Sequence, residues 1–371
     1  MHVVPQNLLV TGGAGFIGSN FVRTHLSAHP RGRIVVLDSL TYAGSTVALN
    51  EAIESGGITF VRGDIRDTHL VIELMREHEI DAVVHFAAES HVDRSISGPD
   101  AFIQTNVVGT HSLLKAAREV WLEGGRDRSA VRFHHISTDE VFGSLEQSAP
   151  AFTEETPYAP NSPYAASKAA SDHLVRAYHH TYGLPVITTN CSNNYGPYQH
   201  PEKLIPLTIT NALLGRILPV YGDGSNIRDW LYVEDHCRAI ELVLARGVVG
   251  RTYNIGGGNE RRNIDLVRAL CADIDREFRH DPTLRDRFPN APPASNARCA
   301  DLIRFVTDRP GHDWRYAIDA TRIRMELGFR PMESAESGLR KTVRWYLDNE
   351  MWWRPLISCD PPLPMAHGGL T

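Results

Sequence analysis

The stretch TGGAGFIGSN, residues 11–20, decides the fold that we expect for this chain. It directly follows the apolar run NLLVT (7–11), and it opens a helical pattern that extends from about Phe16 to His29. Glycines between a strand and a helix let backbone amides approach a pyrophosphate, which then lies at the helix N-terminus. The order of strand, loop and helix therefore predicts a dinucleotide site. Its expected residues are Gly12, Gly15, Phe16, Ile17 and Gly18. The loop also matches the pattern GxGxxG, through Gly13, Gly15 and Gly18.

A carboxylate follows at the position where such a site needs one. Asp38 ends the next apolar run, RIVVLD (33–38), about 20 positions after the last glycine of the loop. A carboxylate there can accept hydrogen bonds from the hydroxyls of an adenine ribose. The following residues, SLTYAG (39–44), contain no Arg or Lys that could neutralise a 2′-phosphate. The sequence therefore predicts NAD rather than NADP as the cofactor.

Apolar strands alternate with helical segments through the first half of the chain. The strands show little polar alternation, which indicates burial on both faces, as in a parallel sheet. This alternation predicts an α/β fold with a Rossmann-like, doubly wound parallel sheet and right-handed crossovers. The further expected strands lie at 58–64, 82–88 and 131–138, and the further expected helices at 68–78, 99–121 and 162–182.

The pattern becomes less regular after about residue 190, where loops that contain Pro and Gly interrupt it. A chain of 371 residues also exceeds the usual size of a single hydrophobic core. We therefore expect a Rossmann domain and a smaller α/β C-terminal domain that binds the substrate. The first comprises 1–190, with 222–255 and about 313–325 returning to it, and the second comprises 191–221, 256–312 and 326–355. The charged stretch 273–298 predicts a partly ordered surface insertion, and 356–371 predicts a flexible tail.

The composition argues against several classes of protein and site. A formal net charge of −6 gives no general attraction to nucleic acid or to an anionic membrane. We find no apolar run near the roughly 20 residues needed to cross a bilayer, and no signal-peptide pattern at the start. The five scattered cysteines favour a reduced, cytoplasmic protein. Neither they nor the paired histidines at 134–135 and 179–180 have the spacing of a metal site, so we expect no metal.

The stretch NSPYAASKAASDHLVRAYHHTYG, residues 161–183, predicts a helix with a reactive pair near its start. Ser162 can cap this helix, and Pro163 can occupy its first position. Tyr164 and Lys168 then lie on one face, at positions i and i+4. A phenol with a pKa near 10 is about 0.1% ionised at neutral pH, and lowering that pKa by about three units needs roughly 4 kcal/mol. We expect the Lys168 ammonium and an oxidised nicotinamide ring to supply it, so that a phenolate deprotonates a substrate hydroxyl while hydride leaves for NAD.

Two carboxylates stand side by side at the exit of an expected buried strand. In ISTDEVF, residues 136–142, Thr138 ends the strand, and Asp139 and Glu140 follow it. Burial penalises a charged carboxylate, so two acids at such a position need a reason. From these residues alone, a pair of loop caps and a catalytic acid–base pair are equally good interpretations.

Together, these motifs resemble a known family. TGGAGFIG (11–18) and YAASK (164–168), in this order, resemble the extended short-chain dehydrogenase/reductases. Further stretches narrow the resemblance to the nucleotide-sugar dehydratases of that family, in particular those that act on dTDP-glucose. They are LTYAG, AAESHVDRSI, HHISTDEVFG, SPYAASKAASDHLVRAY, NCSNNYGPYQHPEKLIPL, IRDWLYVEDHCRAI, YNIGGGNE and DRPGHDWRYAID, and they cover the chain from about residue 8 to 350. Phe142 departs from the family, which usually has Tyr at this position.

The resemblance implies that the enzyme dehydrates a nucleotide-activated hexose in three stages. Oxidation at C4 forms a ketone and acidifies the C5 proton, the C5 proton and the C6 hydroxyl are then eliminated, and hydride finally returns to C6. In this scheme Glu140 is the base, Asp139 is the acid, and Thr138 hydrogen-bonds the C4 oxygen. Desolvation should favour the protonated form of such an acid. The implied catalytic residues are Thr138, Asp139, Glu140, Tyr164 and Lys168.

The resemblance also assigns the residues that bind the two ligands. Besides the glycine loop, Asp38, Tyr164 and Lys168, the implied cofactor contacts are Asp64, Ile65, Ala87, Ala88, Ser90 and Thr105. The implied contacts of the nucleotide-diphosphate sugar are Ser90, Thr138, Asn193, Lys203, Leu204, Pro219, Tyr221, Arg228, Asn263, Arg309 and His312.

Two rival functions and one assembly state remain to be tested. A nucleotide-sugar 4-epimerase shares the glycine loop, Tyr164 and Lys168 but needs no acid–base pair for an elimination. A non-catalytic NAD-binding regulator needs none of these catalytic residues. The small side chains of the helix at 162–182, together with the family resemblance, predict a homodimer.

Overall fold

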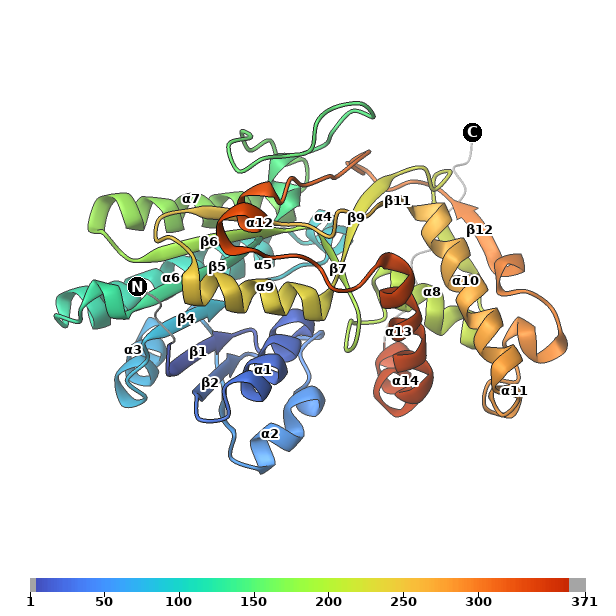
Figure 1. Cartoon of the computed structure of the whole chain (residues 1–371), viewed down its shortest axis with the longest axis horizontal. Coiled ribbons are helices and arrows are strands. Elements are labelled where there is room, and N and C mark those ends of the chain that lie inside the picture. The colour runs from blue at the N-terminus through green and yellow to red at the C-terminus, as the bar shows by residue number, and fades with distance from the viewer. Residues whose placement is uncertain (1–4, 360–371) are drawn as a thin grey trace. The chain divides into compact units, whose positions relative to one another are not determined.

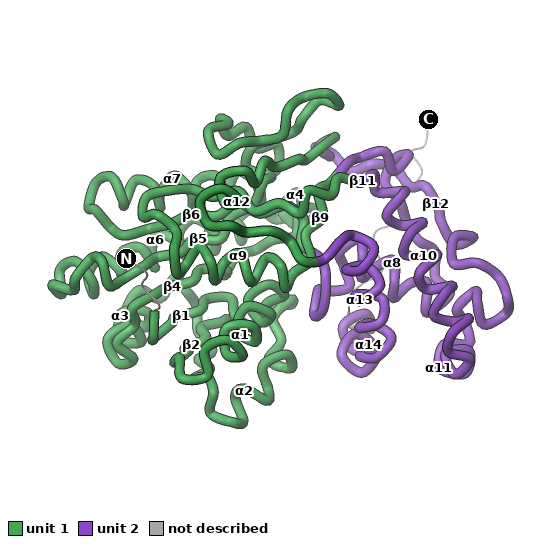
Figure 2. The backbone as a smooth tube through the Cα atoms, viewed as in Figure 1, with its two compact units in different colours: residues 1–194, 228–260, 313–332 green, residues 195–227, 261–312, 333–371 purple. Residues whose placement is uncertain are grey.

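The computed structural model describes residues 5–359 (Figure 1). The chain forms two compact units, which Figure 2 shows in different colours. Unit 1 comprises residues 1–194, 228–260 and 313–332, and unit 2 comprises residues 195–227, 261–312 and 333–371. Each unit is therefore assembled from segments that lie far apart in the sequence. We find no helix in residues 5–359 that is long and apolar enough to cross a membrane.

A seven-stranded sheet forms the centre of unit 1, in the order β10-β6-β5-β4-β1-β2-β3. All of its neighbouring strands pair in parallel, which confirms the predicted doubly wound fold. The strand order reverses between β1 and β4, and ligands of such sheets bind at this point, outside the carboxyl ends of the strands. The strands are β1 (Asn7–Thr11), β2 (Arg33–Asp38), β3 (Ile58–Arg62), β4 (Ala82–His85), β5 (Arg132–Thr138), β6 (Val186–Cys191) and β10 (Thr252–Ile255).

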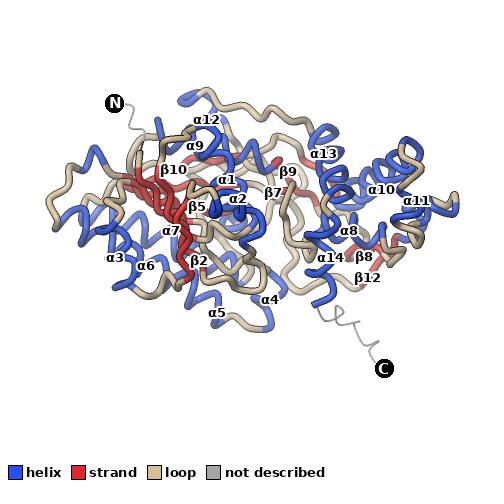
Figure 3. The backbone as a smooth tube through the Cα atoms, turned by 90° about the horizontal axis from the view of Figure 1, so that it is seen from below, coloured by secondary structure: helices blue, strands red, loops and turns tan. Residues whose placement is uncertain are grey.

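Apolar residues on both faces of each strand explain why helices cover the sheet on two sides. Leu8 and Val10 of β1 pack into one core together with Val36, whereas Leu9 packs into a second core with Val35. Figure 3 shows the sheet with α3 and α6 on one side and α9 on the other. The first core includes side chains of α1 (Phe16–Ala28) and α9 (Val233–Arg246), and the second includes side chains of α3 (Thr68–Glu77), α6 (Thr110–Ala117) and α7 (Pro163–Tyr182).

The segment predicted as one helix over 99–121 is helical but not uniform. It begins with α5 (Asp100–Phe102) and includes α6, and two π-helical segments, Ile103–Gly109 and Arg118–Glu123, flank α6. Such wider turns are rare, and they occur frequently at functional sites. The first of them contains Thr105, one of the expected cofactor contacts.

Unit 2 consists mainly of helices. Its longest helix, α10 (Asn263–His280), packs against α8 (Leu204–Leu213) and α13 (Ala335–Asp348). Strands β8 (Leu218–Tyr221) and β12 (Ile303–Val306) form a parallel pair whose register aligns Tyr221 with Val306. The carboxyl ends of these two strands therefore meet at one edge.

The charged stretch 273–298 is not the partly ordered insertion that we expected. Helix α10 continues to His280, the short helix α11 (Leu284–Arg287) follows, and a 3₁₀ turn spans Pro292–Ser295. Phe278, Leu284 and Phe288 are almost fully buried. Their apolar side chains are spaced so that one face of the stretch packs inward, while its many charges face solvent. Charge density alone therefore gave the wrong expectation.

The predicted flexible tail, 356–371, is partly helical. Helix α14 runs from Glu350 to Cys359, so the first residues of the predicted tail belong to it. The remaining residues, 360–371, lie outside the described part of the chain.

The remaining elements are short. A three-stranded sheet has the order β11-β9-β7. These strands and the other helices are β7 (Asn193–Tyr195), β9 (Ile227–Tyr232), β11 (Glu260–Arg262), α2 (Asn50–Glu54), α4 (Val92–Ser97) and α12 (Thr321–Leu327).

Candidate active site

The glycine loop connects β1 to α1, and its glycines are required by close backbone contacts. Gly12 has a φ of +70°, and a Cβ atom there would lie 2.5 Å from the backbone nitrogen of Ala87, just beyond β4. A Cβ atom at Gly18 would lie 2.2 Å from the carbonyl oxygen of Gly12, so only glycine lets α1 approach the loop. No side chain caps α1 at Gly15, which leaves the first amides, including those of Phe16 and Ile17, available to an anion.

Asp38 lies at the carboxyl end of β2, beside this loop. Its Oδ2 accepts a hydrogen bond of 2.9 Å from the amide of Ala14, and its Oδ1 accepts one of 2.8 Å from the amide of Leu40. Burial raises the pKa of Asp38, and the two amides oppose this shift. An ionised carboxylate has about four acceptor positions, so the remaining two can accept hydrogen bonds from ribose hydroxyls.

The sequence reasoning missed a basic residue next to Asp38. In the parallel pairing of β2 with β3, Asp38 is aligned with Arg62, which is exposed. A guanidinium at this position could contact a 2′-phosphate. Only the register of the two strands brings it beside Asp38, so the search of residues 39–44 could not find it.

The other expected cofactor residues of unit 1 follow neighbouring strands at the same edge of the sheet. Asp64 and Ile65 follow β3, and Ala87, Ala88 and Ser90 follow β4. The guanidinium of Arg66 donates to Asp64 at 2.6 Å and lowers its pKa, so this carboxylate is already paired. Ile65 is buried against Gly109, close to the π-helical segment that contains Thr105.

Thr138 and Asp139 lie where β5 ends and a 3₁₀ turn, Asp139–Phe142, begins. The Oγ1 atom of Thr138 accepts a hydrogen bond of 3.3 Å from the amide of Glu140, so Thr138 caps the turn. The side chain of Asp139 is buried, and its Oδ2 has no hydrogen-bond partner among the described residues. Burial, and then the charges of Glu140 and Asp229, raise the pKa of Asp139 well above its usual value. The environment therefore favours a protonated Asp139, as a general acid requires.

Tyr164 is buried close to the same turn, and its electrostatic environment differs from the expected one. Burial, Glu140 and Cys191 raise the pKa of Tyr164 well above 10, and a hydrogen bond with Thr138 opposes them. We expected Lys168 and the cofactor together to lower this pKa. The groups of the chain alone raise it, because two acids and a buried thiol surround the phenol. An additional positive charge is therefore needed to form the phenolate.

Lys168 is held by the backbone of the central sheet. Its Nζ donates a hydrogen bond of 2.8 Å to the carbonyl oxygen of Ile136 in β5. Burial lowers the pKa of Lys168, whereas Asp172 and Cys191 oppose this shift. The sequence reasoning missed both of these residues. Asp172 could have been found by its position one turn after Lys168, whereas Cys191 is brought close only by the pairing of β5 with β6.

Arg228 lies in unit 1 near Asp139, and its side chain is buried. Its Nη2 donates a hydrogen bond of 2.9 Å to the carbonyl oxygen of Asp313, and its guanidinium lies 4.2 Å from the ring centroid of Tyr316. Its charge lowers the pKa of Asp139, against the larger effect of burial. The expected substrate residue Asn193 is in β7, and its buried Oδ1 has no hydrogen-bond partner among the described residues.

The other expected substrate residues are in unit 2. Lys203 directly precedes α8, Leu204 begins it, Pro219 and Tyr221 are in β8, and Asn263 begins α10. The remaining two, Arg309 and His312, follow β12, and the rings of Tyr221 and His312 have centroids 6.1 Å apart. Nδ1 of His312 lies 2.6 Å from a carboxylate oxygen of Asp308. The edge of the β8–β12 pair thus brings Tyr221 together with the loop that contains Arg309 and His312.

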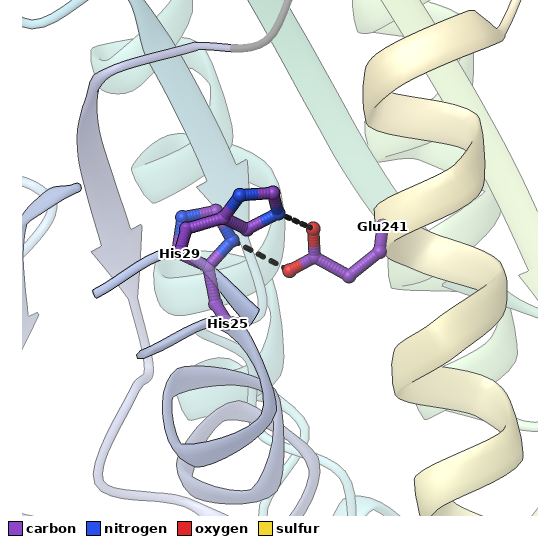
Figure 4. Close-up of side chains that lie close together, drawn as sticks. All are labelled: His25, His29 and Glu241. Carbon is purple, nitrogen blue, oxygen red and sulfur yellow. Dashed lines mark hydrogen bonds and ion pairs between the residues drawn. The ribbon is translucent and has the colours of Figure 1, made fainter. Parts of the chain in front are cut away.

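One cluster of side chains in the described residues has the donor atoms of a metal site. His25 of α1 and His29, which directly follows α1, face Glu241 of α9, and their donor atoms lie within 4.8 Å of one another (Figure 4). However, Nδ1 of His25 is already 2.6 Å from Oε1 of Glu241, which is the distance of a short hydrogen bond. A cation on Nδ1 would move that proton to Nε2, which is buried and has no partner among the described residues. This geometry favours a hydrogen-bonded link between α1 and α9.

Comparisons with known proteins show the family to which the chain belongs. The family model described as GDP-mannose 4,6 dehydratase matches residues 9–342. A dTDP-glucose 4,6-dehydratase of Xanthomonas campestris pv. campestris (strain B100) is 59% identical, over 94% of this chain and 95% of the relative.

Solved structures are similar over almost the whole chain. The dTDP-glucose 4,6-dehydratase DesIV from Streptomyces venezuelae, solved with NAD and TYD bound, has 50% identity and a TM-score of 0.81 and covers 94% of this chain and 99% of that chain. A UDP-glucose 4-epimerase from Thermus thermophilus, in complex with NAD, has 28% identity and a TM-score of 0.76 over 92% and 99% of the two chains. The chain described here belongs to the nucleotide-sugar 4,6-dehydratase family that the matching family model represents, and its most similar relatives above are dTDP-glucose 4,6-dehydratases.

Proposed function

We propose that this protein is a hydro-lyase that uses NAD to convert dTDP-glucose into dTDP-4-keto-6-deoxyglucose and water. The observation that carries the proposal is the pair Asp139 and Glu140, beside Tyr164 at the carboxyl edge of the sheet, with Asp139 favoured in its protonated form. An elimination needs an acid and a base at one sugar, and this pair supplies both. The 59% identity to a named dTDP-glucose 4,6-dehydratase supports the choice of substrate.

The side chains divide the reaction into four proton transfers, the last of which returns a proton to C5. Tyr164 takes the proton of the C4 hydroxyl, with the Lys168 ammonium stabilising the phenolate and Thr138 hydrogen-bonding the C4 oxygen. Glu140 then removes the proton from C5, and Asp139 gives its proton to the C6 hydroxyl, which leaves as water. Asp38 and the amides at the start of α1 would hold NAD, which would supply a reversible acceptor for the C4 hydride. When the hydride returns to C6, Glu140 gives its proton back to C5. The sum is loss of one water, with no net oxidation.

The residues of the chain fit a dinucleotide at this edge. The amides at the start of α1 suit its pyrophosphate, and Asp38 suits a ribose diol. When bound, the oxidised nicotinamide would supply the positive charge that the environment of Tyr164 lacks. We propose that the contacts expected from the family resemblance, Ser90 and Thr105 among them, complete this site.

For the nucleotide-diphosphate sugar, we propose the contacts expected from the family resemblance. Arg228 and Arg309 offer planar, permanently charged donors that suit a diphosphate. Tyr221 offers an aromatic ring to the nucleotide, beside His312. Asn193, Lys203, Leu204, Pro219 and Asn263 complete the proposed set.

A 4-epimerase is the alternative with a specific observation in its favour. The fold, the glycine loop and the Tyr164–Lys168 pair are compatible with the similarity to a UDP-glucose 4-epimerase. An epimerase, however, does not need a buried protonated acid next to a carboxylate base. The environment of Asp139 therefore favours dehydration.

We also propose a homodimer in a reducing compartment, the cytoplasm. Ile103 and Val108, beside α7 in unit 1, are large apolar residues that are exposed in the single chain, and burial of such residues stabilises an interface. The described cysteines Cys191, Cys237, Cys271 and Cys299 are free thiols. Unpaired thiols are usual where disulfides are kept reduced.

Product analysis tests the proposed function directly. Purified protein is incubated with dTDP-, UDP-, GDP- and CDP-glucose, and a 4-keto product is expected from dTDP-glucose without stoichiometric consumption of added NAD. Tyr164→Phe should prevent NADH formation, whereas Glu140→Gln should let NADH absorbance appear while product formation stops. Release of a C4 epimer instead of a 4-keto sugar would establish the epimerase.

A further inference from the structure

A buried carboxylate outside the expected catalytic set lies one helical turn after Lys168. This residue, Asp172, accepts hydrogen bonds with both of its oxygens. Its Oδ1 lies 2.9 Å from Nε2 of His135, and its Oδ2 accepts from Ser137 at 2.8 Å and from Tyr158 at 2.9 Å. His135 and Ser137 belong to β5, the strand whose carbonyl oxygen at Ile136 holds Lys168. Asp172 is therefore fixed beside Lys168 from three directions.

His135 does not neutralise the charge of Asp172. Burial lowers the pKa of His135, and the charge of Lys168 lowers it further. Nδ1 of His135 is buried and has no hydrogen-bond partner among the described residues. A protonated imidazole would place an N–H donor there without an acceptor, which is costly. His135 is therefore neutral and donates from Nε2 to Asp172.

Lys168 is a cation close enough to Asp172 for the carboxylate charge to raise its pKa, against the larger effect of burial. A buried carboxylate without a compensating charge is strongly disfavoured, and so is a buried ammonium. At positions i and i+4 of α7, the two side chains lie on one face of the helix. Each therefore supplies the charge that the other needs.

We propose that Asp172 is a positioning residue that keeps Lys168 protonated and in place while Tyr164 deprotonates the C4 hydroxyl. This inference rests on the proposed function. Asp172 acts only through Lys168, because its own oxygens are occupied by His135, Ser137 and Tyr158.

The other titratable groups around Lys168 do not change charge near neutral pH. Burial lowers the pKa of His85 well below its usual value, and it raises that of Cys191 to about 12. Burial also raises the pKa of Tyr158. Asp139, whose pKa burial raises well above its usual value, acts on Tyr164 in every variant alike, so the difference between profiles with and without the Asp172 charge reports on Tyr164 and Lys168, which act as a coupled pair.

Removal of the Asp172 charge should narrow the pH range over which C4 oxidation is fast. The reactive state combines a Tyr164 phenolate with a Lys168 ammonium. Without the carboxylate, the ammonium loses its proton at lower pH, so the state in which the phenolate and the ammonium coexist ends at lower pH. The base limb of the rate profile should therefore move to lower pH, and the maximum should fall.

The experiment measures the rate of NADH formation against pH in a single turnover. The protein is the NAD-loaded holoenzyme, and each variant is combined with Glu140→Gln so that NADH accumulates. Asp172→Asn should narrow the profile and lower its maximum by about 10- to 100-fold, less than the loss of a group that transfers the proton itself. Asp172→Glu, which keeps the charge, should restore much of the width.

Two further variants separate charge from packing. Tyr158→Phe and Ser137→Ala each remove one hydrogen bond to Oδ2 but leave the carboxylate in place. Both should retain the width of the profile, even where their melting temperatures fall. If Asp172→Asn does not fold, Asp172→Ser removes the same charge with a smaller side chain.

The outcomes are distinct. If the rate of NADH formation depends on pH in Asp172→Asn as it does with Asp172 present, the inference is overturned and the proposed dehydration is unaffected. Equal narrowing in Tyr158→Phe also overturns it, because hydrogen bonding rather than charge would then be responsible. Failure of the unmodified protein to form a 4-keto sugar is a failure of the proposed function, and it is detected before any variant is compared.

Discussion

At the scale of single residues, the surroundings of Asp139 determine its protonation and so the chemistry that it can perform. Thr138, Asp139 and Glu140 are adjacent in the chain, yet only Asp139 combines nearly complete burial with two acidic neighbours that raise its pKa. Their spacing identified the candidates. The distinction between the acid and the base came from the family resemblance, and the environment of Asp139 supports it.

Asp139→Asn should separate elimination from oxidation. The amide keeps the shape of the side chain but cannot donate a proton to the C6 hydroxyl. Elimination should fall by about 10²- to 10⁴-fold, the usual contribution of a positioned acid. Exchange of the C5 proton with solvent deuterium should continue in part, because Glu140 remains a base. The measurement is the rate of 4-keto product together with deuterium at C5 of the recovered substrate, and near-normal product formation would leave Asp139 as a loop cap.

The same substitution should also make the protein more stable at neutral pH. The pKa of Asp139 is higher in the folded state than in the unfolded chain, so its contribution to stability is fully present below pH 3.8 and is lost as the pH rises through the folded pKa. Asn has no such loss. The melting temperature of Asp139→Asn should therefore equal that of the unmodified protein at the lowest accessible pH and exceed it increasingly toward pH 8.

Asp127 is a control for this stability measurement, because its pKa is shifted in the opposite direction from that of Asp139. Asp127 is exposed, and hydrogen bonds from Ser129 lower its pKa. Its contribution to stability is present above pH 3.8 and is lost as the pH falls, so Asp127→Asn should not stabilise the protein at neutral pH. A gain at neutral pH in both variants would point to net charge rather than to burial of Asp139.

Cofactor choice should depend on Asp38 and on the neighbouring Arg62. NAD should bind better than NADP to the unmodified protein, because a 2′-phosphate would meet the carboxylate. Asp38→Ser should raise the affinity for NADP relative to NAD by about tenfold or more, which corresponds to ~1.4 kcal/mol. Adding Arg62→Ala should cancel much of this gain. Equal affinities for the two cofactors before any substitution would show that the argument from Asp38 is wrong.

At the scale of elements, β1, the glycine loop and α1 form as predicted because the contacts that define them are local. The link between α1 and α9 is different, since Glu241 lies far along the chain from His25 and His29. Each side chain taken alone resembles an ordinary surface residue of an amphipathic helix. Only the packing of the two helices on the same face of the sheet brings them together.

Glu241→Gln should measure the strength of this link. The substitution removes the charge that accepts from the buried His25, and we expect a loss of about 1–3 kcal/mol in the free energy of unfolding. Glu73→Gln is the matched control, because Glu73 pairs with His69 at 3.4 Å but both are exposed. It should change the stability by less than about 0.5 kcal/mol. Equal effects of the two variants in denaturant unfolding would contradict a buried link.

At the scale of the whole molecule, the exposed apolar residues beside α7 should form the dimer interface. Light scattering should show a dimer at micromolar concentration. Val108→Glu places a charge on this surface and should shift the protein toward the monomer, because burial of an unpaired charge is costly. Val248→Glu is the control, since Val248 is similarly exposed but lies outside this surface. A monomer at every concentration of the unmodified protein would refute the dimer.

The sequence by itself determined the features that depend on residues close together in the chain. The strand, loop and helix at the N-terminus follow from apolar runs and glycine positions, and so do the parallel sheet and the placement of Tyr164 and Lys168 on one helical face. The sequence also identified Asp139 and Glu140, which follow β5, and Asp38, which is the last residue of β2. All three acids lie where a buried strand ends. The description of 273–298 failed because its apolar spacing was judged less important than its charges.

The tertiary structure decided everything that depends on burial and on charges brought from elsewhere. Asp229 and Arg228 reach Asp139 from β9, and Arg62 comes beside Asp38 through strand register. The pKa of Tyr164 rises rather than falls, because desolvation and nearby acids act on the phenol before any cofactor does. Asp172 becomes part of the site because α7 packs its face against β5, where His135 and Ser137 hold it. Such effects depend on distance and on the exclusion of water, and a linear sequence specifies these only through the completed fold.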